Sequence, residues 1–224
     1  MVDGVKRKLV VFGARQIAEV CAFYFDGDSD YEVVAFTVDG QFLQEDRFAG
    51  RPVVPFEELT ASHPPDAFEV FVAIGYQKMN DLRAAKYAAA KAMGYRLAGY
   101  VSSKAITWST FTLHENTFIM EANVIQPFAR VGANTLVWSG NHVGHHSRIG
   151  DHCFLASHIV VSGNVEIAEH CFIGVNATLR DGIHVAERCL IGGGAVVMKD
   201  TQPGEVYAAA ATEAGRVPSS RVRV

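Results

Sequence analysis

An aliphatic residue stands at every sixth position of the chain from Ile119 to Val197. The series is unbroken and contains only Ile, Val and Leu: Ile119, Ile125, Val131, Val137, Val143, Ile149, Leu155, Val161, Ile167, Ile173, Leu179, Val185, Ile191 and Val197. A helix repeats at about 3.6 residues and a strand at about two, so neither element alone produces this period. A fixed internal repeat of this kind predicts a solenoid, in which each unit buries its apolar side against the next.

Units of six residues with sharp turns between them predict a parallel β-helix with three short strands in each coil. Three hexapeptides make a triangular coil, and each aliphatic side chain points into the prism. The residue after the aliphatic position is often small, which suits a tight corner: Gly132, Gly144, Gly150, Ala156, Ser162, Ala168, Gly174, Ala186 and Gly192. Cys153, Cys171 and Cys189 are one coil apart, so we expect them to stack inside the prism as small apolar residues.

The first hundred residues have a different pattern, in which strand-like and helix-like segments alternate. Strands are predicted at Lys8–Phe12, Glu32–Val38, Glu69–Ile74 and Arg96–Val101, helices at Gln16–Phe25, Phe56–Leu59 and Asn80–Met93, and a loop around Pro52 and Pro55. Such alternation indicates a parallel sheet with right-handed crossovers, which is an α/β, Rossmann-like half-domain. We therefore expect three parts: this half-domain at 1–104, an all-β parallel β-helix at 105–205, and a tail at 206–224 that covers the last coil. Ser102 and Ser103 are expected to mark the linker.

Composition narrows the classes of function. The net charge of -4 leaves no basic footprint for nucleic acid, and no apolar run approaches the about 20 residues of a membrane span. The first residues, MVDGVKRKLVVFG, lack the long apolar core of a signal peptide and are read as the first strand. Four cysteines without a CxxC pair or a disulfide framework indicate a reducing, cytoplasmic setting.

Candidate substrate-binding residues follow three strands of the half-domain, because ligands of such sheets bind beyond the carboxyl ends of the strands. These residues are Gly13, Ala14 and Arg15 after the first strand, Asp39 after the second, and Gly75 and Tyr76 after the third. The Gly13 turn opens a helix, where a phosphate is favoured, and Asp39 can accept hydrogen bonds from a ribose, a base or a sugar. The run GARQIAE is not a GxGxxG fingerprint, so tight turns without a ligand remain the alternative reading.

Seven of the nine histidines lie in the repeat, and the densest run is Asn141 to His146. Since Val143 points inward, His145 and His146 fall at or near a corner and project outward. Imidazole is the natural base near neutral pH, and acyl transfer from a thioester needs a base together with a donor for the oxyanion, such as a backbone N–H in a Gly-rich turn. The cysteines are expected inside, so direct transfer is favoured over a covalent enzyme intermediate. Each histidine could equally be a solvated or capping residue.

The α/β start, the linker and the run from Trp138 to Asp200 together resemble the bacterial sugar O- and N-acetyltransferases, including those of sialic-acid and bacillosamine pathways. The similarity covers residues 8–202. It implies a left-handed β-helix that assembles as a homotrimer, with acetyl-CoA lying between neighbouring helices. It also implies that the N-terminal domain holds the sugar, often as its nucleotide conjugate.

The resemblance also assigns roles to residues. It makes His145 the base and puts His146 where the family often has a glutamate that supports the base, with Asn141 and His142 on the substrate side. It assigns these residues to the coenzyme: Gly174, Asn176, Gly192, Gly193, Gly194, Ala195 and Lys199. Two departures from the family stand out. The run from Tyr207 to Glu213 replaces a Gly-x-Pro-Ala-Lys segment, and the Gly13 turn lacks the usual Ser-Gly-His.

The leading hypothesis is therefore an enzyme that moves an acetyl group from acetyl-CoA to an amino or hydroxyl group of a sugar, often nucleotide-linked. One alternative is a metalloenzyme resembling the γ-type carbonic anhydrases, with zinc ligands drawn from His142, His145, His146 and His152. Another is a non-catalytic scaffold or sugar-nucleotide sensor. The residues do not distinguish nitrogen from oxygen acylation, and they do not name the sugar.

Overall fold

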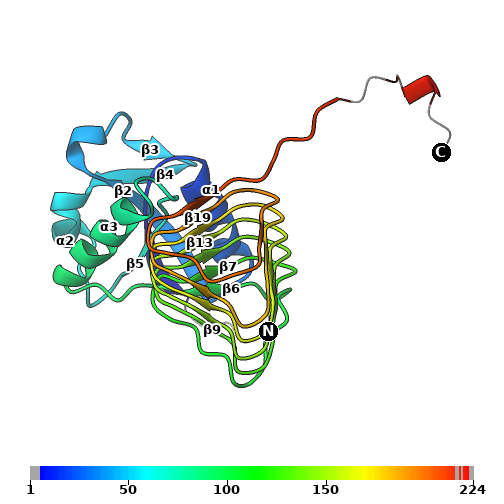
Figure 1. Cartoon of the computed structure of the whole chain (residues 1–224). Helices are drawn as coiled ribbons and strands as arrows, with labels where there is room; N and C mark the ends of the chain where they lie inside the picture. The colour runs from blue at the N-terminus through cyan, green and yellow to red at the C-terminus, as the bar shows by residue number, and fades with distance from the viewer. Residues whose placement is uncertain (1–5, 215–216, 218, 222–224) are drawn as a thin grey trace.

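The structure is a computed structural model that describes residues 6–214, 217 and 219–221. An α/β part packs against one side of a tall β-helix (Figure 1). Two of the sequence-based expectations concern segments that extend beyond these described ranges. The start of the N-terminal run (residues 1–5) and part of the expected tail (residues 215–216, 218 and 222–224) lie outside the described residues. Among the described residues, none of the helices combines the length and the apolar character that a membrane span requires.

The α/β part is built on a five-stranded sheet with the order β3-β4-β2-β1-β5. Its elements are β1 (Arg7–Phe12), α1 (Gln16–Gly27), β2 (Tyr31–Val38), η1 (Gly40–Phe42), β3 (Arg47–Phe48), β4 (Arg51–Pro55), η2 (Phe56–Glu58), α2 (Leu59–Ser62), β5 (Glu69–Val72) and α3 (Asp81–Ala92). Apolar residues of α1 pack with one face of the sheet, and those of α2 and α3 pack with the other. The predicted Rossmann-like half-domain, with its first three strands and both long helices, is confirmed.

Two details of the prediction are wrong. The segment expected to be a loop at Pro52 and Pro55 is β4, which pairs in parallel with β2 and antiparallel with β3. The expected fourth strand, Arg96–Val101, is divided: Leu97 forms a single bridge with Val70. Its last two residues form β6 (Tyr100–Val101), which pairs with the first strand of the β-helix. The division falls at Gly99, where a Cβ would lie 2.8 Å from a backbone carbonyl oxygen.

The β-helix consists of two-residue strands in three parallel sheets. Sheet C contains β6, β7 (Phe118–Ile119), β10 (Leu136–Val137), β13 (Phe154–Leu155), β16 (Phe172–Ile173), β19 (Leu190–Ile191) and β21 (Val206–Tyr207); sheet D contains β8 (Val124–Ile125), β11 (His142–Val143), β14 (Val160–Val161), β17 (Thr178–Leu179) and β20 (Val196–Val197); sheet E contains β9 (Arg130–Val131), β12 (Arg148–Ile149), β15 (Glu166–Ile167) and β18 (His184–Val185). Every residue of the six-residue aliphatic series is buried, none more than 3% exposed. The three stacked cysteines lie in the same core, so the prediction of an aliphatic-lined solenoid is confirmed.

The corners of the β-helix have a periodic backbone signature. A residue with positive φ stands at every sixth position: Asn116, Ala122, Phe128, Asn134, Gly140, His146, His152, His158, Asn164, His170, Asn176, Gly182, Arg188 and Gly194. Asn, Gly and His are the residues most often found in this left-handed region. The left-handed backbone conformation therefore accounts for four of the seven histidines in the repeat. The exceptions are His142, His145 and His184.

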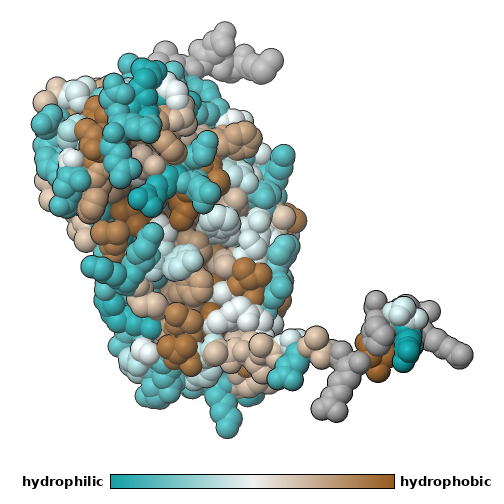
Figure 2. Space-filling model, turned by 90° about the horizontal axis from the view of Figure 1, so that it is seen from above, coloured by the Kyte–Doolittle hydropathy of each residue, from teal (hydrophilic) through white to brown (hydrophobic). Residues whose placement is uncertain are grey.

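The three outer faces of the prism differ in character. Sheet C presents Phe118, Leu136 and Phe154, which are buried against the α/β part. Sheet E presents exposed charged and polar side chains, whereas sheet D presents Val160 and Val196, which are 41% and 62% exposed. Figure 2 shows one side of the molecule, on which hydrophobic patches lie between hydrophilic areas. Sheet D is thus the more apolar of the two faces that the α/β part leaves uncovered.

Ser102 and Ser103, which we expected to mark a linker, are instead held against the α/β part. The carboxylate of Asp28, after α1, accepts hydrogen bonds from Tyr100 Oη (2.6 Å), Ser103 N (2.8 Å) and Ser102 Oγ (3.1 Å). These hydrogen bonds, first among them those of Ser103 and Tyr100, lower the pKa of Asp28 to about 2. The connection between the two parts is therefore fixed.

The tail follows the expectation only in part. Its strand β21 extends sheet C by pairing with β19, and Tyr207 packs against the β-helix core. Residues 208–214 are exposed and run away from the last coil (Figure 1). The ends of sheets D and E thus gain no strand from the described part of the tail.

His152, at the corner under α3, makes the fold sensitive to pH. Its Nδ1 lies 2.7 Å from Asn134 Nδ2, and its ring centroid lies 4.8 Å from that of His170. Burial lowers the pKa of His152, and the nearby His170 and Arg83 lower it further. The folded chain thus binds fewer protons here than the unfolded chain, so stability rises with pH and is lost as the pH falls below about 6.5.

We expect His152→Asn to lose less thermal stability than the original protein when the pH is lowered from about 8 to about 5.5. Asparagine suits the left-handed backbone at this corner and carries no titrating group. The measurement is the unfolding temperature of both proteins across this range. The values at the upper pH serve as the internal control, because imidazole is neutral there in both states. A parallel decline of the two proteins would contradict the assignment.

Candidate active site

His145 and His146 occupy the corner between β11 and β12. The backbone N–H of His145 donates to Gln126 Oε1 (2.8 Å), which fixes the start of the turn. His146 has a φ of 61°, and its ring lies against Phe128 with a centroid distance of 4.8 Å and an interplanar angle of 36°. Both side chains are exposed at the rim of the prism, as the sequence predicts.

The two imidazoles contact each other through Nδ1, at 3.2 Å. A hydrogen bond between two such nitrogens needs a proton on one and a lone pair on the other. When His145 donates from Nδ1, its Nε2 carries a lone pair and can accept a proton from a substrate. In that arrangement His146 is the acceptor that selects the tautomer of the base, as a carboxylate does in many other sites.

The Nε2 edge of His145 lies over Gly163, one coil below. A Cβ added at Gly163 would lie 2.9 Å from His145 Nε2 and 2.9 Å from Asp181 Oδ1. These distances are shorter than real Cβ atoms show, so the imidazole and the carboxylate occupy the volume that a side chain would need, and only glycine fits between them.

The corner continues in steps of one coil from His145 through Gly163 and Asp181 to Lys199. At its lower end a hollow of about 290 Å³ is lined by Arg180, Asp181, Gly182, Ile183, Met198, Lys199 and Asp200. Lys199, assigned to the coenzyme by resemblance, thus lies on the same corner as His145. Neighbouring strands are about 4.8 Å apart, so the line from base to lysine is about 14 Å long.

The other residues assigned to the coenzyme lie at a different corner, between sheets C and D. Gly174 and Gly192 stack there, because a Cβ at Gly174 would lie 2.5 Å from Gly193 N. Asn176 has a left-handed backbone, and Ala195 is buried. Within one chain, sheet D therefore separates this glycine-rich corner from His145.

The two residues expected on the substrate side of the base have different environments. Asn141 is buried, with its side-chain nitrogen bonded to the Trp138 carbonyl and its Oδ1 accepting from Ile159 N at 2.7 Å. It therefore supports the corner and is covered in this structure. His142 is half-buried on the outer face of sheet D.

The candidate residues of the α/β part meet at the carboxyl ends of β1, β2 and β5. Gly13, with a φ of 127°, passes so close to Ala73 that a Cβ would lie 3.1 Å from its carbonyl oxygen. Ala14 packs partly against the core, and Arg15 is exposed at the start of α1. The carbonyl oxygen of Gly75 accepts a hydrogen bond from Arg83 at 2.7 Å.

Two further candidates at these strand ends have aromatic or charged partners. Tyr76 is 53% exposed and lies against Phe154 and Phe172 of the β-helix, at centroid distances of 5.1 and 4.6 Å. Asp39 is paired with Lys86 of α3, whose ammonium lies 5.5 Å from the ring centroid of Phe12. Sequence reasoning missed this lysine, because the segment that forms α3 shows only an Ala-rich helical pattern.

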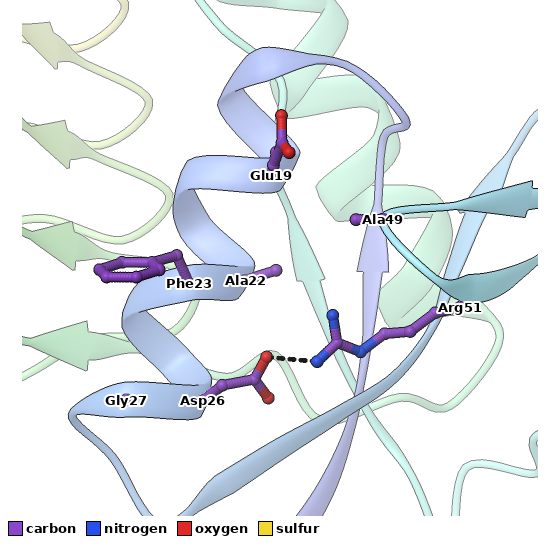
Figure 3. A pocket seen from close by; sticks show the side chains of 7 residues that line it. All are labelled: Glu19, Ala22, Phe23, Asp26, Gly27, Ala49 and Arg51. Carbon is purple, nitrogen blue, oxygen red and sulfur yellow. Dashed lines mark hydrogen bonds and ion pairs between the residues drawn. The ribbon is translucent and has the colours of Figure 1, made fainter.

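A second hollow, of about 360 Å³, lies between α1 and the β3–β4 turn and contains none of the candidate residues. It is lined by Glu19, Ala22, Phe23, Asp26, Gly27, Ala49 and Arg51. Figure 3 shows Asp26 and Arg51 pointing toward one another, in an ion pair of 2.6 Å. Asp26 and Arg51 therefore neutralise one another, and the carboxylate of Glu19 lines the same hollow.

The four histidines of the metalloenzyme alternative do not meet within one chain. His145 and His146 share a corner, His142 stands on sheet D, and His152 lies at the corner under α3. Within the described ranges, no group of three or more His, Cys, Asp or Glu side chains could hold a metal ion.

Comparison with known proteins agrees with this architecture. The family described as "Hexapeptide repeat of succinyl-transferase" matches residues 164–199. A variant of perosamine N-acetyltransferase from Caulobacter crescentus, solved with CoA and GDP-perosamine, superposes with a TM-score of 0.81 at 23% identity, over 90% of this chain and 93% of that one. This chain has the same fold. No curated protein matches it in sequence.

Two further solved structures extend the comparison. The acetyltransferase domain of PglB from Neisseria gonorrhoeae gives a TM-score of 0.77 at 24% identity, over 91% of this chain and 97% of that one. WeeI from Acinetobacter baumannii gives 0.75 at 20% identity, over 88% and 94%. The predicted architecture, a Rossmann-like half-domain followed by a left-handed β-helix, is therefore confirmed at the level of the fold.

Proposed function

We propose that this chain is an acetyltransferase that moves an acetyl group from acetyl-CoA to an amino group, or alternatively a hydroxyl group, of a nucleotide-linked sugar. The observation that carries the proposal is the exposed imidazole of His145, whose Nδ1 lies 3.2 Å from Nδ1 of His146, so that Nε2 is the nitrogen left to accept a proton. Two like-folded proteins support the choice of ligands: one is described with CoA and GDP-perosamine, and the other with acetyl coenzyme A.

The proposed reaction is a direct transfer with His145 as general base. The sugar nitrogen or oxygen bonds to the thioester carbonyl carbon while His145 Nε2 takes its proton. A backbone N–H of the Gly-rich corner stabilises the oxyanion that forms. The C–S bond then breaks, and the proton passes from the imidazolium to the departing thiolate. No enzyme nucleophile is used, in keeping with the three β-helix cysteines being buried in its core.

A homotrimer is part of the proposal. The base and the glycine-rich corner, with Gly192, Gly193 and Gly194, lie on either side of sheet D in one chain. A neighbouring copy would bring its own glycine-rich corner to His145 and enclose the acetyl-CoA between the two prisms. The exposed valines of sheet D suit such a contact. The four free, buried cysteines suit a reducing, cytoplasmic setting.

The α/β part, proposed to span 1–104, would hold the sugar nucleotide at the carboxyl ends of β1, β2 and β5. Gly13, Ala14 and Arg15 would receive the phosphates at the start of α1, and Tyr76 would line the path toward the β-helix. Asp39 is engaged by Lys86, so the pair rather than a free carboxylate would meet the nucleotide. The β-helix at 105–205 and the tail at 206–224 complete the proposed division.

The test is an assay of thiol release from acetyl-CoA with a panel of nucleotide-linked sugars. The panel pairs each amino sugar with its hydroxyl counterpart, and mass spectrometry identifies the product. We expect thiol release that depends on one class of sugar, together with a higher unfolding temperature in the presence of CoA. Absence of both responses across the panel would contradict the proposal. A product with the hydroxyl sugar alone would assign oxygen rather than nitrogen acylation.

A further inference from the structure

We propose that Asp181 is a positioning residue for His145: its carboxylate approaches the ring over the backbone of Gly163 and balances the positive charge that the base gains. This inference rests on the proposed function, because it concerns the charge that forms on the base during proton transfer. It adds to the site a carboxylate from a turn two coils away in the chain.

The geometry that supports this role is a three-residue column along one corner. His145, Gly163 and Asp181 occupy equivalent positions in successive coils. The position where Gly163 would carry a Cβ lies 2.8 Å from His145 Cε1, 2.9 Å from its Nε2 and 2.9 Å from Asp181 Oδ1. The imidazole and the carboxylate therefore lean toward the same point from opposite sides. Any side chain on the middle coil would separate them.

The chemistry explains why a carboxylate is needed at this place. His146 can select the tautomer of His145, but a neutral imidazole does not offset the positive charge that His145 gains with the proton. A carboxylate on the other side of the ring provides that offset when the charge develops. The other charged groups of this corner, Arg180, Lys199 and Asp200, line the hollow next to Asp181.

The size of the effect follows from the exposure of Asp181. Solvent and salt screen an exposed charge, so its influence is smaller than that of a buried carboxylate. We expect Asp181→Asn to lower kcat about fivefold at low ionic strength. The KM values for both substrates should stay nearly unchanged, because Asp181 is proposed to act through His145.

The test compares Asp181→Asn and Asp181→Glu with the original protein at low and high salt. We expect the glutamate variant to recover most of kcat. The difference in kcat between Asp181→Asn and the original protein should shrink as salt is added. Unchanged kcat in Asp181→Asn, or a change confined to the KM for acetyl-CoA, would overturn the inference. The latter result would make Asp181 a coenzyme contact. Because the side chain is exposed, the unfolding temperature should remain within about 1–2 °C.

A measurement without substrates separates this inference from the proposed function. In the unliganded protein, the ring-proton NMR resonances of His145 should shift in Asp181→Asn, while those of His184 on sheet E should not. If the protein transfers no acetyl group but shows this shift, the effect of Asp181 on His145 is supported and the proposed acetyl transfer is wrong. If the His145 resonances do not move, the carboxylate does not act on the ring, whatever the activity.

Discussion

Replacing Arg83 by methionine should lower the stability of the protein by about 3–5 kcal/mol, because it leaves a set of buried acceptors without their donor. Arg83 is fully buried and donates to the carbonyls of Gly75 (2.7 Å), His152 (2.9 Å) and Cys153 (2.9 Å). It also reaches the carbonyl of Asn134, at 3.1 Å. One guanidinium thus joins the end of the α/β sheet to two successive coils.

The charge of Arg83 is balanced by dipoles rather than by a carboxylate. Burial lowers its pKa to about 10, so the guanidinium remains charged at neutral pH. Every hydrogen bond that it makes ends on a carbonyl or amide oxygen. Lysine has fewer donors and lacks the planar fork, so Arg83→Lys should recover only part of the loss.

The measurement is the unfolding temperature, which should fall by about 10 °C for a chain of this size. Lys91→Met is the matched control, because it removes a cation from the same helix whose ion pair with Glu115 is exposed. An exposed pair contributes about 0.2–1 kcal/mol. If Arg83→Met and Lys91→Met lost similar stability, the hydrogen bonds of Arg83 would not be what holds the α/β part to the β-helix.

The β-helix could be predicted from the sequence because the residues that point into the prism are aliphatic and repeat every six positions. A coil buries one aliphatic residue on each side, and every copy of that residue is Ile, Val or Leu. The stacked cysteines obey the same rule. The exposed position of His145 follows as well, since Val143 fixes which way its neighbours point.

Other features leave no periodic signal. Arg83 reads as a surface residue of an Ala-rich helix, because its partners are backbone carbonyls far along the chain. The pairing of β6 with β7 depends on a close approach at Gly99, which two residues of strand pattern cannot reveal. The stacking of His145, Gly163 and Asp181 along one corner follows from the coil length, yet its significance requires knowing where the imidazole edge lies.

The left-handed corners explain why histidine was an ambiguous signal. His146, His152, His158 and His170 stand at positions with positive φ, where histidine is tolerated for backbone reasons. A count of histidines therefore overstates the chemistry of the repeat. His145 differs because it precedes the left-handed position, so the backbone does not account for a histidine there, and its ring contacts that of His146.

That distinction leads to the largest expected effect on activity. His145→Asn should lower kcat by about 10²–10⁴-fold, which is the usual contribution of a general base. Asparagine cannot take the proton of the attacking group at neutral pH. The ring of His145 is exposed, so the variant should fold with a change in stability within about 0.5 kcal/mol. The measurement is acetyl transfer at saturating concentrations of both substrates, with CoA binding followed by the thermal shift.

His184→Asn is the matched control for this prediction. It removes another exposed histidine of the same repeat, one whose ring lies 3.8 Å from Glu166 on sheet E, away from Gly163. Because the imidazole of His184 lies on sheet E, away from the proposed base, this variant should keep nearly full turnover. Undiminished transfer in His145→Asn would remove His145 as the base. Equal losses in both variants would attribute the effect to the β-helix as a whole rather than to proton transfer at one corner.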